Sequence, residues 1–151
     1  MPAVAITPNS PERQKKALAA LLYQQMKATG ASKTQAEVTA ALHHALTPGS
    51  PARIFLLENE NRKAIGCCFC NLCVGIESGG NYLWINEIYV VPHESGKGNG
   101  RLLLEYVADW AKQHHCRYMM AQTWPKNEAS QKLFENCGFE STEVVQMGRR
   151  V

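Results

Sequence analysis

The sequence predicts an α+β fold in which helices pack against a mostly antiparallel sheet. Three segments in the middle of the chain, residues 54–57, 64–76 and 82–91, are strand-like and are separated by turn-rich stretches. Hydrophobic residues on either side of them recur with helical spacing, and one predicted helix is apolar on a single face, which must pack on a sheet. The chain has 151 residues, 45% of them hydrophobic, which is the size of one ordinary domain. We therefore expect a single domain over residues 1–151.

The first third of the chain predicts one short strand followed by two helices. Residues 3–7 have strand character, and the breaking run after them places Ser10 as the N-cap of a first helix. The apolar positions of that helix keep their spacing until Gly30. Ser32 and Gln35 form a capping-box pattern, so we expect a second helix to begin near Ser32.

The last third predicts a helix, a strand, another helix and a final strand. The first of these helices follows a glycine-rich loop, and its expected inward face consists of Leu102, Leu103, Tyr106, Val107 and Trp110. A strand over residues 118–124, a helix over 127–136 and a strand over 144–147 follow. Only twelve residues follow Phe139, fewer than two strands and a turn need. We therefore expect a homodimer that completes the sheet or buries its edge.

The charges of the chain are mixed and scattered. There are 16 basic and 13 acidic residues, which gives a net charge of +3, and the Lys and Arg residues do not run together. Nucleic-acid and membrane-surface partners need basic patches or runs. The sequence therefore predicts no nucleic-acid partner and no membrane partner.

Six cysteines raise the alternatives of a disulfide framework and a metal site. The first ten residues lack the basic start and sustained apolar run of a secretory signal, which favours reduced thiols in the cytoplasm. Cys70 and Cys73 alone have the spacing of half a zinc site. The segment around them alternates like a strand, has no histidine beside it and meets no second CxxC, which favours packing as small apolar side chains. We therefore expect no metal.

A glycine loop, Gly96 to Gly100, lies between an apolar strand and an amphipathic helix. Backbone N–H groups are free at such a helix start and the helix dipole favours an anion, so phosphate binding is one interpretation. A plain tight turn is the other. No Ser or Thr follows Lys97, so the loop fails the P-loop pattern, and Arg101 and Leu103 break the dinucleotide-binding pattern.

Three segments together resemble the GCN5-related N-acetyltransferase (GNAT) superfamily: residues 86–92 (NEIYVVP), 96–103 (GKGNGRLL) and 127–139 (NEASQKLFENCGF). Their order and spacing are those of the family, and the resemblance is close from residue 54 to residue 139. It implies a three-layer α/β/α acyl-CoA N-acyltransferase fold, with a mixed, mostly antiparallel sheet splayed between the fourth and fifth strands. It also implies acetyl-CoA as co-substrate, with the pantetheine arm in the gap of the splay, where unpaired backbone groups need partners.

The resemblance assigns the cofactor-binding residues position by position. They are Ile88, Tyr89, Val90, Ser95, Gly96, Lys97, Gly98, Asn99, Gly100, Arg101, Asn127 and Phe134. Ser95 stands where the family usually has Arg or Gln, which puts one pyrophosphate contact in question. Lys97 and Arg101 could supply charge near the pyrophosphate or could be solvated surface residues. Asn127 would also act as the N-cap of the last helix.

Glu87 is the expected general base. It is a carboxylate within an otherwise apolar strand, so desolvation should raise its pKa. It matches the position that often carries the catalytic glutamate in the resembling family. The alternative is a structural carboxylate satisfied by an Arg or by backbone amides. A backbone N–H near Val90 would polarise the thioester carbonyl.

The proton donor for the leaving thiolate is less well defined. Phe134 stands where the family commonly has tyrosine, and phenylalanine cannot donate a proton. Ser130, one turn earlier on the same helix face, is the candidate substitute, although a helical serine can instead bond its own backbone.

These residues predict an acetyl-CoA-dependent N-acetyltransferase that transfers acetyl directly to a primary amine of a small molecule or protein. The alternatives are a non-catalytic acyl-CoA-binding or regulatory protein of the same fold and a structural domain whose glycine loop binds nothing. No acidic cluster marks a pocket for a polycationic acceptor, so the acceptor itself is not predicted.

Overall fold

Five strands form one sheet in the order β1-β2-β3-β4-β5. The computed structural model describes residues 3–151; residues 1 and 2, which the single-domain prediction includes, lie outside them. The strands are β1 (Ala3–Ile6), β2 (Ala52–Glu58), β3 (Ala64–Gly75), β4 (Gly80–Val90) and β5 (Tyr118–Ala121). Neighbouring strands are antiparallel from β1 to β4, and β4 and β5 are parallel. The mixed, mostly antiparallel sheet predicted from the sequence is confirmed.

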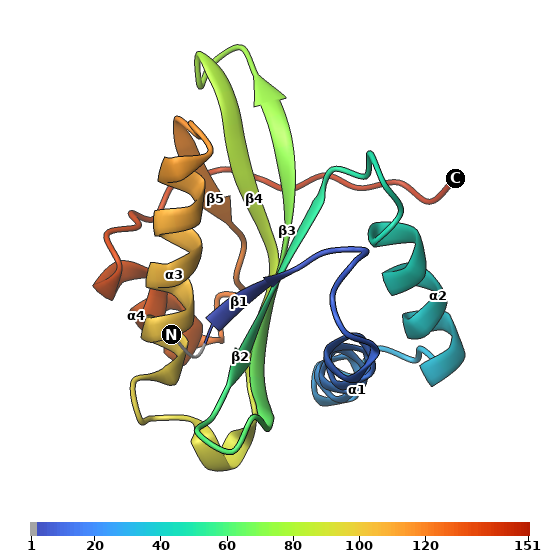
Figure 1. The fold of residues 1–151 in the computed structure, drawn as a ribbon. Coiled ribbons are helices and arrows are strands. Elements are labelled where there is room, and N and C mark those ends of the chain that lie inside the picture. Colours follow the sequence, from blue (N-terminus) through green and yellow to red (C-terminus); the bar gives the residue numbers. More distant parts are fainter. Residues whose placement is uncertain (1–2) are drawn as a thin grey trace.

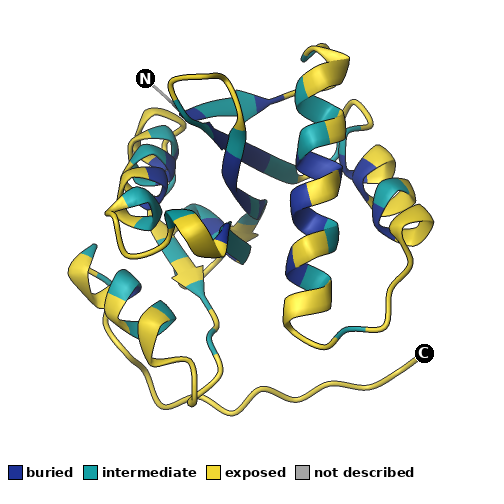
Figure 2. Ribbon diagram, turned by 90° about the horizontal axis from the view of Figure 1, so that it is seen from below, coloured by how far each residue is buried: buried dark blue, intermediate teal, exposed yellow. Residues whose placement is uncertain are grey.

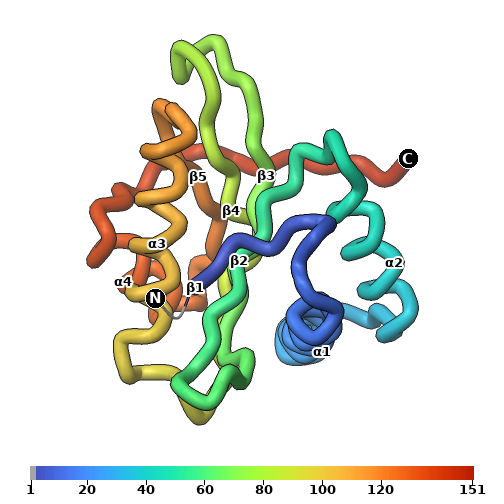
Figure 3. The backbone as a smooth tube through the Cα atoms, viewed as in Figure 1, coloured from blue at the N-terminus to red at the C-terminus, as the bar shows by residue number. Residues whose placement is uncertain are grey.

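Helices cover both faces of this sheet. They are α1 (Glu12–Ala28), α2 (Gln35–Ala45), α3 (Asn99–Gln113) and α4 (Glu128–Asn136), with a short 3-10 helix η1 (Pro92–Glu94) after β4. Figures 1 and 3 show α1 and α2 on one side of the sheet and α3 and α4 on the other. The three-layer α/β/α architecture is therefore confirmed.

The inward face of α3 differs slightly from the predicted one. Its buried residues are Leu103, Leu104, Val107 and Ala111, with Tyr106 and Trp110 partly buried against the core. Leu102, expected to face inward, is 36% exposed. The helix is rotated so that Leu104 takes the inner position, and Phe55 of β2 meets Trp110 edge-on at a centroid distance of 5.4 Å.

The caps of the first two helices also differ from the predicted ones. Ser10 does not cap α1: its Oγ accepts from the Thr7 N–H at 2.9 Å and closes the preceding turn. The capping box of α2 is formed by Thr34 and Glu37 instead of Ser32 and Gln35. Glu37 supplies the acceptor for the Thr34 N–H at 2.8 Å, so the helix begins at Gln35.

The last predicted strand is wrong. Residues 139–151 form no helix or strand, and Val144, Val145 and Met147 are at least 79% exposed. Figure 2 shows this C-terminal segment as an exposed coil that runs away from α4. Strand-forming residues need a neighbouring edge to pair with, and residues 140–151 make no backbone hydrogen bond with any part of the described chain.

The clustered cysteines lie in the core. Cys67, Cys68 and Cys70 of β3 are fully buried, and the sulfur atoms of Cys68 and Cys70 are 3.5 Å apart. They pack as small apolar side chains, as expected. Within residues 3–151 no helix has the length and apolarity needed to cross a bilayer.

Candidate functional site

Glu87 lies on β4 and faces α1. Its Oε2 accepts a hydrogen bond from Gln25 Nε2 at 2.7 Å. Burial raises the pKa of Glu87, and the hydrogen bond from Gln25 acts in the opposite direction. The carboxyl group is thus half-buried and hydrogen-bonded, and its pKa is raised above the usual value, as expected of a general base.

A β-bulge decides which face Glu87 occupies. Phe69 of β3 is opposite Glu87, but its neighbour Cys70 is opposite Ile85, so Asn86 is an extra residue on β4. Cross-strand partners share a face and successive residues alternate, so Ile85 and Glu87 face opposite sides although they are two residues apart. Asn86 Oδ1 accepts from Asn71 Nδ2 at 2.7 Å beside the bulge.

The sheet opens next to the same segment. β4 and β5 pair only where Tyr82–Ile85 lies beside Tyr118–Ala121. Beyond Ile85, the outer edge of residues 86–90 has no strand partner in the described part of the chain. The predicted splay between the fourth and fifth strands is therefore present, and its unpaired backbone groups are available to a ligand.

The glycine loop leads from η1 into α3 with its backbone donors free. Gly96 and Gly98 have φ of 74° and 84°, a conformation that residues with a Cβ rarely adopt, and Gly98 is the N-cap of the 15-residue α3. In the described chain, the backbone N–H groups of residues 96–101 donate to no acceptor. A run of free donors at the positive end of a helix fits a pyrophosphate.

The side chains of the loop make contacts with neighbouring residues of the protein. Lys97 Nζ lies 3.3 Å from Glu94 Oε2, and Asn99 Nδ2 donates to the Glu94 carbonyl at 3.0 Å. Ser95 Oγ donates to the Val91 carbonyl at 3.3 Å, back towards β4. Arg101 is exposed, with Nε 3.8 Å from a Glu105 carboxylate oxygen. The anion-binding capacity of the loop therefore rests on its backbone amides.

The residues predicted on α4 lie in the layer opposite α1. Asn127 caps the helix: its Oδ1 accepts from the Ser130 N–H at 3.1 Å. Phe134 is only 6% exposed and meets Phe139 edge-on, with ring centroids 5.0 Å apart. Ser130 and Phe134 are thus not brought together with Glu87 on one face of the sheet.

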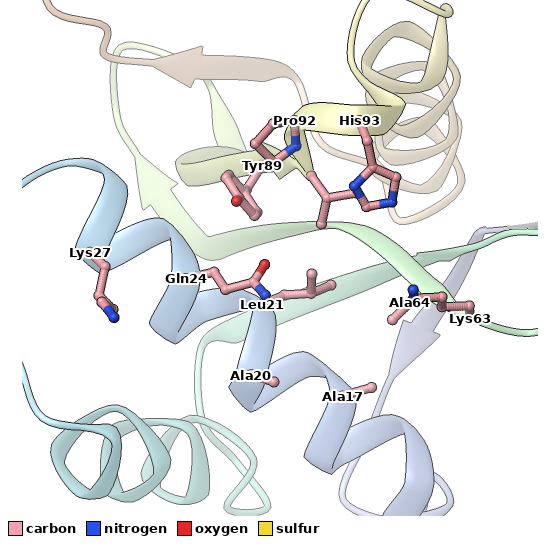
Figure 4. Close-up of a pocket in the computed structure, with 11 residues that line it drawn as sticks. Ala17, Ala20, Leu21, Gln24, Lys27, Lys63, Ala64, Tyr89, Pro92 and His93 are labelled. Carbon is pink, nitrogen blue, oxygen red and sulfur yellow. The ribbon is translucent and has the colours of Figure 1, made fainter.

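A cavity of about 600 Å³ lies between α1 and the end of β4. Figure 4 shows Gln24 of α1 on one side and Tyr89, Pro92 and His93 on the other. Glu87 itself does not line the cavity, but Tyr89, which follows it by two residues on β4, does. The ionisable lining residues of the cavity are Lys27, Lys63, Tyr89 and His93, and none of the lining residues among positions 3–151 is a carboxylate.

Sequence reasoning missed Gln25, the partner of Glu87. A pattern could have revealed it, because Gln25 continues the helical spacing of Leu18, Leu21 and Leu22 on the buried face of α1. A polar residue at the core position of an amphipathic helix needs a buried partner.

Comparison with known proteins is consistent with this geometry. Residues 20–139 match the pattern of the Acetyltransferase (GNAT) family. The chain is 35% identical over 63 residues to aminoglycoside N(6')-acetyltransferase type 1 of Salmonella typhimurium, which is 42% of this chain and 43% of that protein. It is 30% identical over 87 residues to the uncharacterized N-acetyltransferase YhfO of Bacillus subtilis, 58% of each chain. The matches thus span less than two thirds of either relative.

Solved structures share the fold over the whole chain. The crystal structure of a probable acetyltransferase has a TM-score of 0.87 at 20% identity and covers 100% of this chain and 98% of its own. The aminoglycoside N-acetyltransferase AAC(6')-Iy in complex with CoA has a TM-score of 0.79 at 21% identity, covering 98% and 93%. With 120 residues (20–139) matched by the family pattern and the fold matched throughout, the chain belongs to the acetyltransferase (GNAT) family.

Proposed function

We propose that this protein is an N-acetyltransferase that uses acetyl-CoA to acetylate a primary amine of a small molecule or protein. The observation that carries the proposal is the run of free backbone N–H groups at residues 96–101, next to the unpaired edge of β4. That arrangement suits a ligand with a pyrophosphate at one end and an extended amide-containing arm.

The proposed cofactor residues divide between these two features. The pyrophosphate would be bound by the backbone amides of the glycine loop, which are those of Gly96, Lys97, Gly98, Asn99, Gly100 and Arg101. Ser95 would lie at the entrance of the loop. The backbone of Ile88, Tyr89 and Val90 would bind the pantetheine arm, and Asn127 and Phe134 of α4 would lie on its other side. A free N–H of this β4 segment would polarise the thioester carbonyl.

Glu87 would act as the general base. The acceptor ammonium loses a proton to Glu87, the amine nitrogen forms a bond to the acetyl carbon, and the carbon–sulfur bond breaks to release a thiolate. The acylated nitrogen would then lose its second proton to solvent and become the neutral amide nitrogen, and the sulfur would gain a proton from solvent or from Ser130, whose hydroxyl solvent would reprotonate. A thiol has a pKa of about 8.5, so the thiolate is a modest base and solvent can suffice.

The acceptor is proposed only as an amine class. The relatives named above include aminoglycoside acetyltransferases. The cavity between α1 and the end of β4 has Lys27 and Lys63 in its lining, and none of the described residues that line it is a carboxylate, which complements a polycation poorly. We therefore expect amines of low positive charge to be better acceptors than aminoglycosides.

The second candidate function is a non-catalytic acyl-CoA-binding protein. Phe134 favours it, because this buried side chain lacks the hydroxyl that would protonate the thiolate. Thermal unfolding with and without acetyl-CoA separates ligand binding from a structural role. A ligand at about 100 times its Kd stabilises a protein by roughly 2.7 kcal/mol, which is several degrees for this size. No shift would exclude both candidates, and thiol release with a panel of amines then separates enzyme from binder.

We also propose that residues 1–151 form one acetyltransferase domain that works as a homodimer in the cytoplasm. The dimer is supported by the C-terminal segment, which makes no backbone hydrogen bond to the described chain, and by the outer edge of β5, which has no strand partner there. The compartment is supported by the six cysteines, none of which is in a disulfide within residues 3–151 and three of which, Cys67, Cys68 and Cys70, are buried.

A further inference from the structure

A buried amide on α1 faces Glu87. Gln25 is 6% exposed, and among residues 3–151 it is the one polar side chain in the core. Its Nε2 donates to Glu87 at 2.7 Å, whereas its Oε1 is buried without a hydrogen-bond partner. A buried acceptor without a partner is unfavourable, and an apolar side chain would simply extend the face of Leu18, Leu21 and Leu22. The fold alone therefore gives no reason for a glutamine here.

The two ends of an amide suit the two states of a carboxyl group. A carboxylate only accepts hydrogen bonds, so it fixes the amide with Nε2 towards Glu87. A protonated carboxyl carries an O–H donor, which needs an acceptor such as Gln25 Oε1. The terminal torsion of glutamine is broad and roughly two-fold, so one side chain can present either atom to the same partner.

We propose that Gln25 is a positioning residue for Glu87, which holds the carboxylate through Nε2 before proton transfer and the protonated carboxyl through Oε1 afterwards. This inference rests on the proposed function. The acceptor ammonium loses its N–H bond, the electron pair stays on nitrogen, and a new O–H bond forms on Glu87. Because the hydrogen bond to the charged form is the stronger of the two, Gln25 keeps Glu87 available as a base in spite of burial.

No other charge replaces this contact in the described chain. Within residues 3–151 no ion pair reaches Glu87. On β3, burial raises the pKa of Cys67, and a hydrogen bond with Cys70 together with burial raises the pKa of Cys68, so both thiols are neutral near pH 7. On α1, the Lys27 ammonium lies over the Tyr23 ring, 5.6 Å from its centre, and among the described residues it forms no ion pair with Glu87.

The test is the ionisation of Glu87 in the full chain without ligand, followed by NMR of ¹³C-labelled glutamate carboxyls and assigned with Glu87→Gln. In Gln25→Met, which keeps the length of the side chain, the ionisation constant should fall about three- to tenfold, because the variant loses a hydrogen bond to the carboxylate that is roughly 1 kcal/mol stronger than the one to the protonated carboxyl. The exposed Gln113→Met variant should leave it unchanged. In the wild type, the side-chain amide signals of Gln25 should shift with the midpoint of Glu87.

A second variant keeps the test independent of packing. In Gln25→Glu two carboxyls share one site, so Glu87 should titrate in two steps, one of them at higher pH. An unchanged ionisation of Glu87 in folded Gln25→Met, a single unshifted step in Gln25→Glu, or Gln25 amide signals that ignore the titration would each overturn the proposal.

Kinetics separate this inference from the proposed function. The acid limb of kcat/KM should move to higher pH in Gln25→Met, in step with the NMR midpoint, while KM for acetyl-CoA stays constant. If the NMR coupling is present but Glu87→Gln transfers acetyl at the wild-type rate, the base assignment fails and the bonding of Gln25 to both forms of the carboxyl stands.

Discussion

Ile85 and Glu87 are two residues apart on β4 but face opposite sides of the sheet, because Asn86 is an extra residue in the pairing with β3. Ile85 is 2% exposed in the core, whereas Glu87 meets Gln25 of α1. In a regular strand both side chains would face the same way. The bulge thus takes a carboxylate out of the apolar core and aims it at the α1 side.

Inserting one alanine between Phe69 and Cys70 should therefore do much more harm than truncating Asn86. The inserted residue gives Asn86 a partner and removes the bulge, so that Ile85 and Glu87 face the same side; a regular sheet then turns the carboxyl into the core or its neighbours out of it, which strongly destabilises the fold. Asn86→Ala is the matched control, because it keeps the bulge and removes only the contact with Asn71, at a loss of up to about 1 kcal/mol. Denaturant unfolding measures the free energy of unfolding of both variants. Equal free energies of unfolding for the two variants would show that the bulge does not determine which side of the sheet Glu87 faces.

Glu87→Gln should remove most acetyl transfer and also change how stability depends on pH. Burial raises the pKa of Glu87 above its ordinary value of 4.5, so the folded state binds this proton more tightly than the unfolded state. The stability that Glu87 contributes is therefore complete below about pH 4.5 and is lost as the pH rises through the folded pKa.

The measurement compares free energies of unfolding at pH 4 and pH 8. Because glutamine cannot ionise, Glu87→Gln should gain stability relative to the wild type between these two values. A difference between variant and wild type that stays constant with pH would contradict the raised pKa.

Periodicity was enough to predict most of the fold. The three central strands, the amphipathic α3 and the cap at Asn127 depend on local spacing and composition, and the structure has all of them. The helix α2 begins at Gln35 and not near Ser32 as predicted, because the sequence holds two overlapping capping patterns: Thr34 with Glu37 has the same spacing as Ser32 with Gln35.

The site was only partly predictable, because its decisive features depend on pairing between distant segments. Glu87 stood out as a carboxylate in an apolar strand. The side of the sheet that Glu87 faces depends on the register of β4 against β3, and its partner Gln25 is 62 residues away in sequence. The strand expected at residues 144–147 failed for the same reason: its residues have strand character, but a strand also needs a partner edge.

Gly98→Ala should weaken acetyl-CoA binding as well as stability. Gly98 has φ of 84° at the start of α3, so alanine costs about 1–2 kcal/mol of strain there. The new Cβ would also hold a phosphate away from the loop amides. Gly49→Ala is the matched control: Gly49 has φ of 86°, and a Cβ there likewise meets nothing within 4 Å. We expect similar stability losses but a roughly tenfold weaker Kd, about 1.4 kcal/mol, only for Gly98→Ala. Equal affinities in calorimetry would rule out phosphate binding at this loop.

Disrupting the exposed C-terminal segment should convert the proposed dimer to a monomer. Val145 and Met147 are 87% and 90% exposed and belong to a segment with strand character. If a second copy of the chain covers them, the double substitution Val145→Asp and Met147→Asp places charges in an apolar contact and prevents association. Val74→Asp is the control, because Val74 is also 79% exposed but belongs to the end of β3 and not to the C-terminal segment. Light scattering at high concentration should give a dimer for the wild type and for Val74→Asp, and a monomer for the double variant. A monomeric wild type would refute the dimer, and a dimeric double variant would show that another surface forms it.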